Sequence, residues 1–174
     1  MRDMMQKTKG SIQFVPHIGE YYQLCKPKVV YLILFTAAAG MLLSTPGLVS
    51  LDVMFFGLLG IGLGAASGAA VNHWVDRRID LIMLRTKNRP LPQGNISSRS
   101  ALVFAISLGV LSMVVLVAFV NIMTAVLTFF ALIGYAVIYT MFLKHSTPHN
   151  IVLGGAAGAA PPVLGWTAVT NELT

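Results

Sequence analysis

Long apolar stretches dominate the chain, and short polar segments separate them. Four of these stretches are continuous, while a fifth is rich in Gly and Ala and contains Pro161-Pro162. Since a helix needs about 20 apolar residues to cross a bilayer, the pattern predicts an all-α, polytopic transmembrane bundle with five spans. The expected spans cover residues 29–43, 53–71, 101–120, 122–143 and 151–169.

Prolines mark two of these spans. Pro27 is tolerated in a first helical turn, so the first span is expected to begin near it and to remain uncleaved. Pro161 and Pro162 remove two backbone donors, and we expect them to break the fifth helix. Residues 1–20 are predicted to form a mobile cytoplasmic tail, and residues 21–174 a membrane domain.

The composition excludes an ordinary soluble domain. Hydrophobic residues make up 56% of the 174 residues and charged residues only 10%, against roughly a quarter charged in a soluble protein. The net charge of +6 does not indicate nucleic-acid binding, because the cations lie between apolar runs rather than on a soluble fold. The lone Cys25 cannot form an intrachain disulfide.

The positions of the cations predict the orientation. If every apolar run crosses once, all 12 Lys and Arg residues fall on one side of the membrane. The positive-inside rule makes that side cytoplasmic. The N-terminus and the 75–100 loop are therefore expected inside, and the C-terminus outside. The cations precede the first span, lie between the second and third, or follow the fourth, as Lys144 does.

A stripe of small and polar residues runs along the second predicted span at intervals of four. Because a step of four advances a helix by about 40° beyond a full turn, neighbours in the series lie one above another. The glycines favour close approach of a second helix, and the stripe becomes acidic at the cytoplasmic end. Its members are Gly60, Gly64, Gly68, Asn72, Asp76 and Asp80.

Asn72, Asp76 and Asp80 are candidate ligands for Mg²⁺. They offer one amide oxygen and two carboxylates over about 12 Å of helix. Mg²⁺ typically takes one or two carboxylates together with substrate phosphate oxygens. The alternative is a solvated helix end whose acids pair with Arg77 and Arg78.

A cationic loop follows this acidic stripe. Arg85, Lys87 and Arg89 stand within five residues, and Pro90 and Pro92 end any helix there. Acids that hold a metal beside Arg side chains suit a diphosphate, although the cations could instead set topology or contact anionic lipid. We therefore predict a site for a diphosphate ester whose apolar tail lies between the helices.

These residues resemble a known family. The segment Asn72-His-Trp-Val-Asp76-Arg-Arg-Ile-Asp80 is similar to the first Asp-rich motif, N-x-x-x-D-x-x-x-D, of the UbiA-type intramembrane prenyltransferases. Its continuation through Met83, Arg85-Thr86 and 89–92 resembles the haem O synthase (protohaem IX farnesyltransferase) branch. So do residues 26–40 and the segment from Lys144 to Trp166, and the likeness extends over about residues 21–170.

The resemblance implies transfer of farnesyl from farnesyl diphosphate to a vinyl group of protohaem IX, with Mg²⁺ as cofactor. The products would be pyrophosphate and haem O, which goes into terminal respiratory oxidases. Haem is then a substrate, and haem A synthase or oxidase assembly factors are implied partners in a bacterial inner membrane. The implied metal ligands are Asn72, Asp76 and Asp80, the catalytic residues Asp76, Asp80 and Arg85, and the diphosphate-binding residues Arg85, Arg89, Lys87 and Lys144.

One departure from the family pattern concerns the length. The family has about nine transmembrane helices and a second Asp-rich motif in its later half. This sequence holds five expected spans, and its other acids, Asp3, Glu20, Asp52 and Glu172, are isolated. We expect the chain to be the N-terminal part of such an enzyme, and its activity in this form stays open.

The sequence is also compatible with other functions. A transporter would place its charged site near the bilayer midplane. A non-catalytic assembly protein would need the glycines but no acid pair, and a related prenyltransferase would act on a quinone precursor. Two further hypotheses are that histidines contact the haem and that aromatic side chains line an isoprenoid tunnel. The alternative for the aromatic side chains is that they face lipid or pack within the bundle. The two hypotheses concern His17, His73, His145, His149, Phe129, Phe130, Tyr135 and Tyr139.

Overall fold

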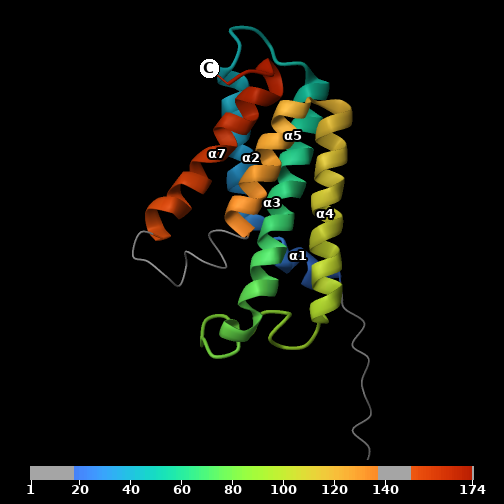
Figure 1. Cartoon of the computed structure of the whole chain (residues 1–174), viewed down its shortest axis with the longest axis vertical. Coiled ribbons are helices and arrows are strands. Elements are labelled where there is room, and N and C mark those ends of the chain that lie inside the picture. Colours follow the sequence, from blue (N-terminus) through green and yellow to red (C-terminus); the bar gives the residue numbers. More distant parts are fainter. Residues whose placement is uncertain (1–17, 137–149, 174) are drawn as a thin grey trace, which may run out of the picture.

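The structure is a computed structural model that describes residues 18–136 and 150–173, and for residues 150–157 the backbone alone. All regular elements in these ranges are helices (Figure 1). The elements are α1 (Ile18–Leu24), α2 (Pro27–Leu43), α3 (Leu51–Asp80), α4 (Ser98–Phe119), α5 (Ile122–Ile133) and α7 (Asn150–Thr170).

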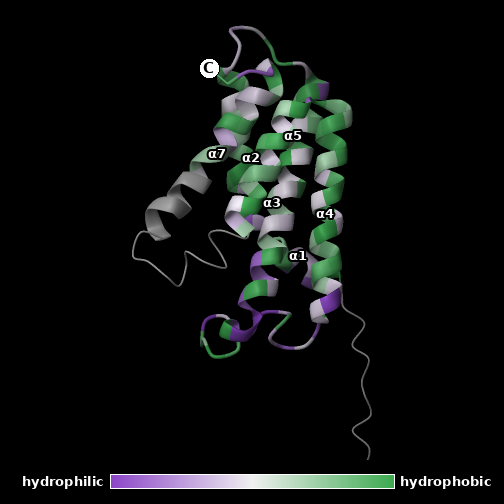
Figure 2. Ribbon diagram, viewed as in Figure 1, coloured by the Kyte–Doolittle hydropathy of each residue, from purple (hydrophilic) through white to green (hydrophobic). Residues whose placement is uncertain are grey.

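The described residues confirm the expected all-helical architecture, with apolar helices long enough to cross a membrane. By length and apolar composition, α3 and α4 can each cross a membrane, and α1 with α2 form a third candidate that is bent by 55°. The apolar helix 122–136 is shorter, and the rest of the expected fourth span lies outside the described residues. Hydrophilic residues gather at the end of the bundle where α3 stops (Figure 2).

The helix α2 starts at Pro27, as expected, after Lys26, whose φ of 49° is left-handed. Two details differ from the sequence expectations, and the first is the short helix α1, which precedes the first predicted span. The helix α7 continues through Pro161 and Pro162, so the predicted break is wrong. At Pro162 the backbone of α7 lies directly against α2, since a Cβ built on Gly40 would approach the Pro162 carbonyl oxygen to 2.1 Å. Packing against α2 therefore supports the helix at the residue where a backbone donor is missing.

Close packing of α3 against α4 depends on the predicted glycines. A Cβ on Gly60 would lie 2.5 Å from Leu116 of α4, and a Cβ on Gly64 would lie 3.1 Å from Ser112 Oγ. Ser112 Oγ donates to the carbonyl oxygen of Gly60 at 2.6 Å, and Ser67 Oγ of α3 donates to that of Ala105 at 2.7 Å. The expected close approach of a second helix is thus confirmed.

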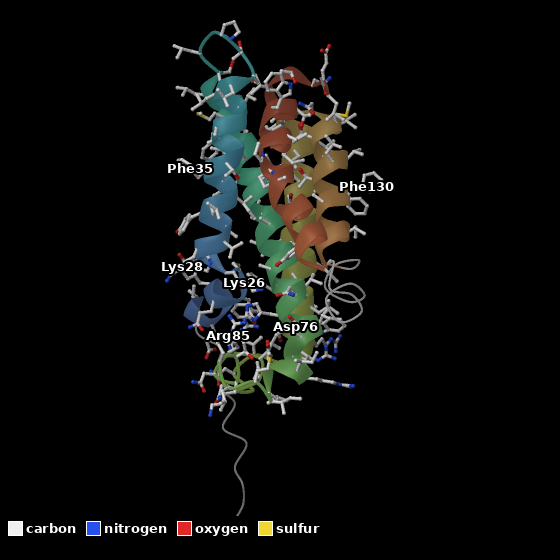
Figure 3. The ribbon with its side chains drawn as sticks, turned by 90° about the vertical axis from the view of Figure 1, so that its left-hand side faces the viewer. Lys26, Lys28, Phe35, Asp76, Arg85 and Phe130 are labelled. Atoms are coloured by element: carbon white, nitrogen blue, oxygen red, sulfur yellow. The ribbon has the colours of Figure 1, made fainter. Side chains whose placement is uncertain are left out.

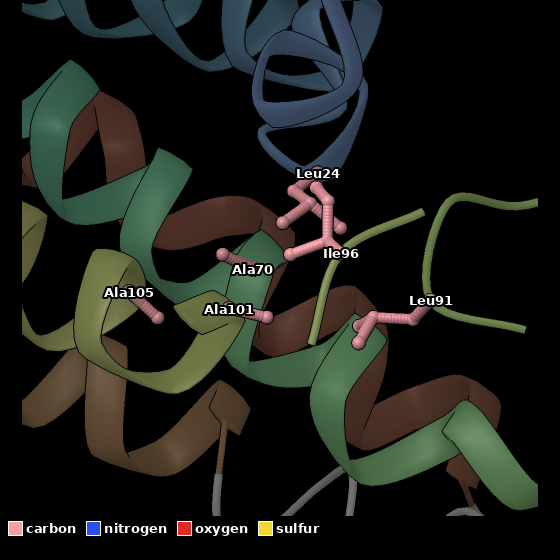
Figure 4. Close-up of a cluster of buried hydrophobic side chains, with 6 residues drawn as sticks. All are labelled: Leu24, Ala70, Leu91, Ile96, Ala101 and Ala105. Atoms are coloured by element: carbon pink, nitrogen blue, oxygen red, sulfur yellow. The ribbon is translucent and has the colours of Figure 1, made fainter. Parts of the chain in front are cut away.

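Buried side chains form two clusters on either side of α3. One joins α1, α3, α4 and the loop before α4 near the hydrophilic end (Figure 4), and the other joins α2, α3 and α7 towards the opposite end. The first holds Leu24, Ala70, Leu91, Ile96, Ala101 and Ala105, and the second, which we call the upper cluster, holds Ala37, Met41, Ile61, Leu164 and Ala168.

Candidate functional site

The acidic stripe lies at the hydrophilic end of the bundle because α3 is long. Its 30 residues extend about 45 Å at 1.5 Å per residue, whereas the hydrocarbon core of a bilayer is about 30 Å thick. The last turns of α3 therefore reach the membrane surface. Asn72, Asp76 and Asp80 on these turns are buried, with exposed fractions of 5%, 3% and 3%.

A chain of polar contacts connects α2 to this stripe. Lys26, at the bend between α1 and α2, donates from Nζ to Oδ1 of Asn72. The amide of Asn72 then donates to Oδ2 of Asp76 at 3.1 Å. The left-handed backbone at Lys26 turns the chain from α1 into α2 at the level of Asn72. Lys26 was not among the site residues predicted from the sequence, although a cation directly before the helix-starting Pro27 was a usable signal.

The loop after α3 folds back onto Asp80. Arg89 Nη1 lies 2.7 Å from Asp80 Oδ2, and the two side chains are 27% and 4% exposed. Thr86 Oγ1 donates to the backbone carbonyl of Asp80 at 3.2 Å. Arg77 instead lies over the Trp74 ring, 4.4 Å from its centroid. Arg89, and not Arg77 or Arg78, is therefore the ion-pair partner of Asp80 among the described residues.

A polar pocket of about 260 Å³ opens beside these groups. Three cationic and two acidic side chains line it. The cationic side chains can attract an anion, and the acidic side chains can attract a metal cation. Figure 3 shows Lys26, Asp76 and Arg85 at the same end of the bundle. The lining residues are Lys26, Asn72, Asp76, Ile79, Asp80, Met83, Arg85, Thr86, Arg89 and Tyr135.

The other predicted site residues lie elsewhere or outside the description. Lys87 is exposed and does not line the polar pocket. His73 is buried and lines neither this pocket nor the apolar cavity described below. Lys144, His17, His145, His149 and Tyr139 fall outside the described residues. The roles predicted for these seven residues stay predictions.

An apolar cavity of about 310 Å³ continues from the polar pocket into the bundle. Lys26 and Tyr135 line both spaces, so the two meet at these side chains. The cavity wall comes from α2, α3, α5 and α7, and includes Ile33, Gly64, Ala131 and Pro161. Of the predicted tunnel aromatics, Tyr135 lines the cavity, whereas Phe129 and Phe130 are exposed on α5 (Figure 3).

The donor set of the polar pocket fits Mg²⁺. In the described part of the chain, no three His, Cys, Asp or Glu side chains form a metal-binding group, so these residues supply no all-protein cage. An amide oxygen and two carboxylates beside a pocket are what Mg²⁺ uses when a bound phosphate completes its coordination. Arg85 and Arg89 at the same pocket can neutralise the remaining phosphate charge.

The chain is thus an all-helical bundle with apolar helices long enough to cross a membrane, in which a polar pocket at one end meets an apolar cavity. A protein-family model described as the UbiA prenyltransferase family matches residues 33–174. The chain belongs to the UbiA prenyltransferase family.

Curated relatives make the resemblance narrower. Proteins named protoheme IX farnesyltransferase are 68% identical in Thioalkalivibrio sulfidiphilus, 60% in Nitrosococcus oceani and 59% in Idiomarina loihiensis. The matches cover 88%, 88% and 90% of this chain but 51%, 52% and 53% of those proteins. The chain thus spans about half the length of the curated relatives it matches.

Solved structures agree on the fold. A UbiA homolog from Archaeoglobus fulgidus, bound to GPP and Mg²⁺, aligns with a TM-score of 0.75 at 22% sequence identity. The alignment covers 89% of this chain and 56% of that protein. The same homolog bound to DMAPP and Mg²⁺ aligns equally well. At this identity the likeness shows the shared fold.

Proposed function

We propose that this chain binds farnesyl diphosphate with Mg²⁺ and forms part of a protohaem IX farnesyltransferase. The observation that carries the proposal is the junction at Lys26 and Tyr135, where a pocket lined by acids and cations meets an apolar cavity. A diphosphate ester has the same two-part character. The curated relatives named for this activity support farnesyl and protohaem IX as the substrates.

In the proposed complex, Asn72, Asp76 and Asp80 hold Mg²⁺, and Lys26, Arg85 and Arg89 face the diphosphate. Mg²⁺ supplies Lewis-acid stabilisation of the charge that develops on the leaving pyrophosphate. The cations add electrostatic stabilisation at the same oxygens, because their side chains line the same pocket. Lys87 and Lys144 stay candidate diphosphate contacts.

The reaction breaks the bond between C1 of the farnesyl group and its bridging oxygen, and the electron pair leaves with pyrophosphate. A vinyl carbon of protohaem IX attacks C1, and water adds to the cation left on the porphyrin substituent, releasing a proton. The apolar cavity keeps other water from the farnesyl chain, since most of its lining residues are aliphatic.

The proposed topology follows the charges. The hydrophilic end that carries the polar pocket (Figure 2) is placed at the cytoplasmic surface of a bacterial inner membrane by the positive-inside rule. Five spans with residues 1–20 as a cytoplasmic tail agree with this orientation. A transporter is disfavoured because the charged pocket lies at one end of the bundle and not at its middle.

The test begins with binding of radiolabelled farnesyl diphosphate to the chain in lipid nanodiscs, with Mg²⁺ or with EDTA. Binding that needs Mg²⁺ and is lost in Asp76→Asn is expected. Asp52→Asn, at the exposed opposite end of α3, is the control and should bind normally. Unchanged binding by Asp76→Asn would refute the assignment of the pocket.

A second measurement addresses the chemistry. Membranes that contain the chain receive protohaem IX, farnesyl diphosphate and Mg²⁺, and chromatography separates the haems. Formation of haem O that disappears in Asp76→Asn is the expected sign of activity. Binding without any product would mean that the chain holds the donor site and that another polypeptide segment is needed for turnover.

A further inference from the structure

The apolar cavity extends into the bundle, away from the polar pocket. Thr36 on α2, Ile61 on α3, Thr128 on α5 and Leu164 on α7 are the lining residues farthest from the pocket along each helix. Ile61 and Leu164 also belong to the upper cluster of buried residues. The cavity therefore ends where close packing of the core begins.

The crossing of α2 and α7 fixes this end. A Cβ on Gly40 would lie 2.1 Å from the carbonyl oxygen of Pro162, and a Cβ on Gly165 would lie 2.0 Å from that of Ala37. The two backbones are therefore in direct contact. Towards the hydrophilic end, α7 diverges from the bundle (Figure 1), and the cavity occupies the space below the crossing.

The depth of the cavity corresponds to a definite chain length. Asn72 and Ile61 are eleven residues apart on α3, about 16 Å at 1.5 Å per residue. An extended chain advances about 1.2 Å per backbone bond, judged from a fully extended polypeptide. An isoprene unit contributes four such bonds and therefore about 5 Å on the same measure. Three units reach from the polar pocket to Ile61, and a fourth would meet the packed core.

We propose that Ile61, held by Leu164 and the α2–α7 crossing, is a chain-length stop that makes the site select a prenyl group of three isoprene units. This inference rests on the proposed function and adds a specificity-determining residue to it. Ile61 is 2% exposed, so it cannot swing into solvent to admit a longer chain. Shorter chains fit but leave apolar surface at Ile61 and Leu164 without contact.

The experiment measures competition against radiolabelled farnesyl diphosphate on the full chain in lipid nanodiscs with Mg²⁺. The competitors are the diphosphates with two, three and four isoprene units. The unsubstituted chain should prefer three units over four by about tenfold or more, since a misfit of a few methylenes in an apolar pocket has effects of this size. Ile61→Ala should reduce that preference at least tenfold, and Ile61→Phe should shift the preference towards two units.

A control separates depth from general loosening of the core. Leu58 packs against the same upper cluster but does not line the cavity, so Leu58→Ala should keep the preference for three units. The stop would be disproved by equal affinities of the unsubstituted chain for three and four units. An unchanged preference in both Ile61 variants, or an equal change in Leu58→Ala, would also disprove it. If no prenyl diphosphate binds the unsubstituted chain, the proposed function fails and the stop fails with it.

Discussion

Arg89 and Asp80 form an ion pair in which Nη1 lies 2.7 Å from Oδ2, and this pair holds the loop after α3 against the end of that helix. The carboxylate is almost completely buried, while the guanidinium is partly exposed. A buried carboxylate that loses its partner retains the full cost of its desolvation. The pair therefore places the Arg89 guanidinium at the polar pocket. The buried Asp80 carboxylate depends on that guanidinium to offset the cost of its desolvation.

Arg89→Ala should lower the free energy of unfolding by roughly 1–3 kcal/mol, because Asp80 is left buried without its ion-pair partner. The double variant Arg89→Ala/Asp80→Asn should recover part of this loss, since the uncompensated charge is gone. Denaturant unfolding of the chain in detergent micelles measures both. If the double variant were instead less stable than Arg89→Ala by the amount that Asp80→Asn costs alone, the two side chains would not be energetically coupled and the prediction would be wrong.

Lys26→Asn should weaken binding of farnesyl diphosphate about tenfold or more with little change in unfolding temperature. Asn tolerates the left-handed backbone found at this position, so the substitution removes the ammonium without straining the bend. Hydrogen bonds to charged groups contribute about 1.5–3 kcal/mol, which corresponds to this loss. The expected decrease is measured by titration of the labelled ligand in nanodiscs.

Lys28→Asn provides the matched control for that titration. Lys28 stands two residues further along, is exposed, and lines neither the polar pocket nor the apolar cavity. Its loss should leave the affinity within about a factor of two, since exposed charges act weakly through salt solution. Equal losses in both variants would mean that only the general positive charge of this surface attracts the ligand.

Gly40→Ala and Gly165→Ala should each destabilise the protein by about 1–3 kcal/mol, the usual range for overpacking a close contact. The added methyl group would overlap the α2–α7 backbone contact, and this cost exceeds the roughly 1 kcal/mol that Ala gains over Gly inside a helix. Gly68→Ala is the control, because its Cβ would lie 3.6 Å from Tyr135, an ordinary contact. Thermal unfolding in detergent should separate the two groups, and a destabilised Gly68→Ala would count against this explanation.

Ser112→Ala should cost about 1 kcal/mol of stability, because its buried hydroxyl donates across the α3–α4 contact to the Gly60 carbonyl oxygen. Ser107→Ala offers a comparison on the same helix. Its exposed hydroxyl bonds only to the Val103 carbonyl oxygen one turn earlier, so its removal should be neutral or slightly stabilising. Denaturant titration of the two variants in parallel decides the matter, and equal stabilities would show that the interhelical bond contributes nothing measurable.

The sequence by itself determined the elements and the chemistry that follow from local pattern. Apolar runs and their polar boundaries predicted the helical membrane bundle, since a bilayer leaves the backbone few other ways to satisfy its hydrogen bonds. The four-residue spacing from Gly60 to Asp80 predicted both a face of small residues on α3 and an acidic stripe at its end. The alignment of each set of residues depends on one helix alone, and therefore on positions that the sequence states directly.

Only the tertiary structure decided which distant residues meet. It brought Lys26 of the α1–α2 bend to Asn72 and Arg89 of the loop to Asp80, whereas the sequence pattern offered only the neighbouring Arg77 and Arg78 as alternative partners for the acids. It also carried α7 intact through Pro161 and Pro162. A proline weakens a helix locally, but direct backbone contact at Gly40 and Gly165 holds α7 in place. That contact requires a partner helix more than 100 residues away in the chain, so no local pattern could reveal it.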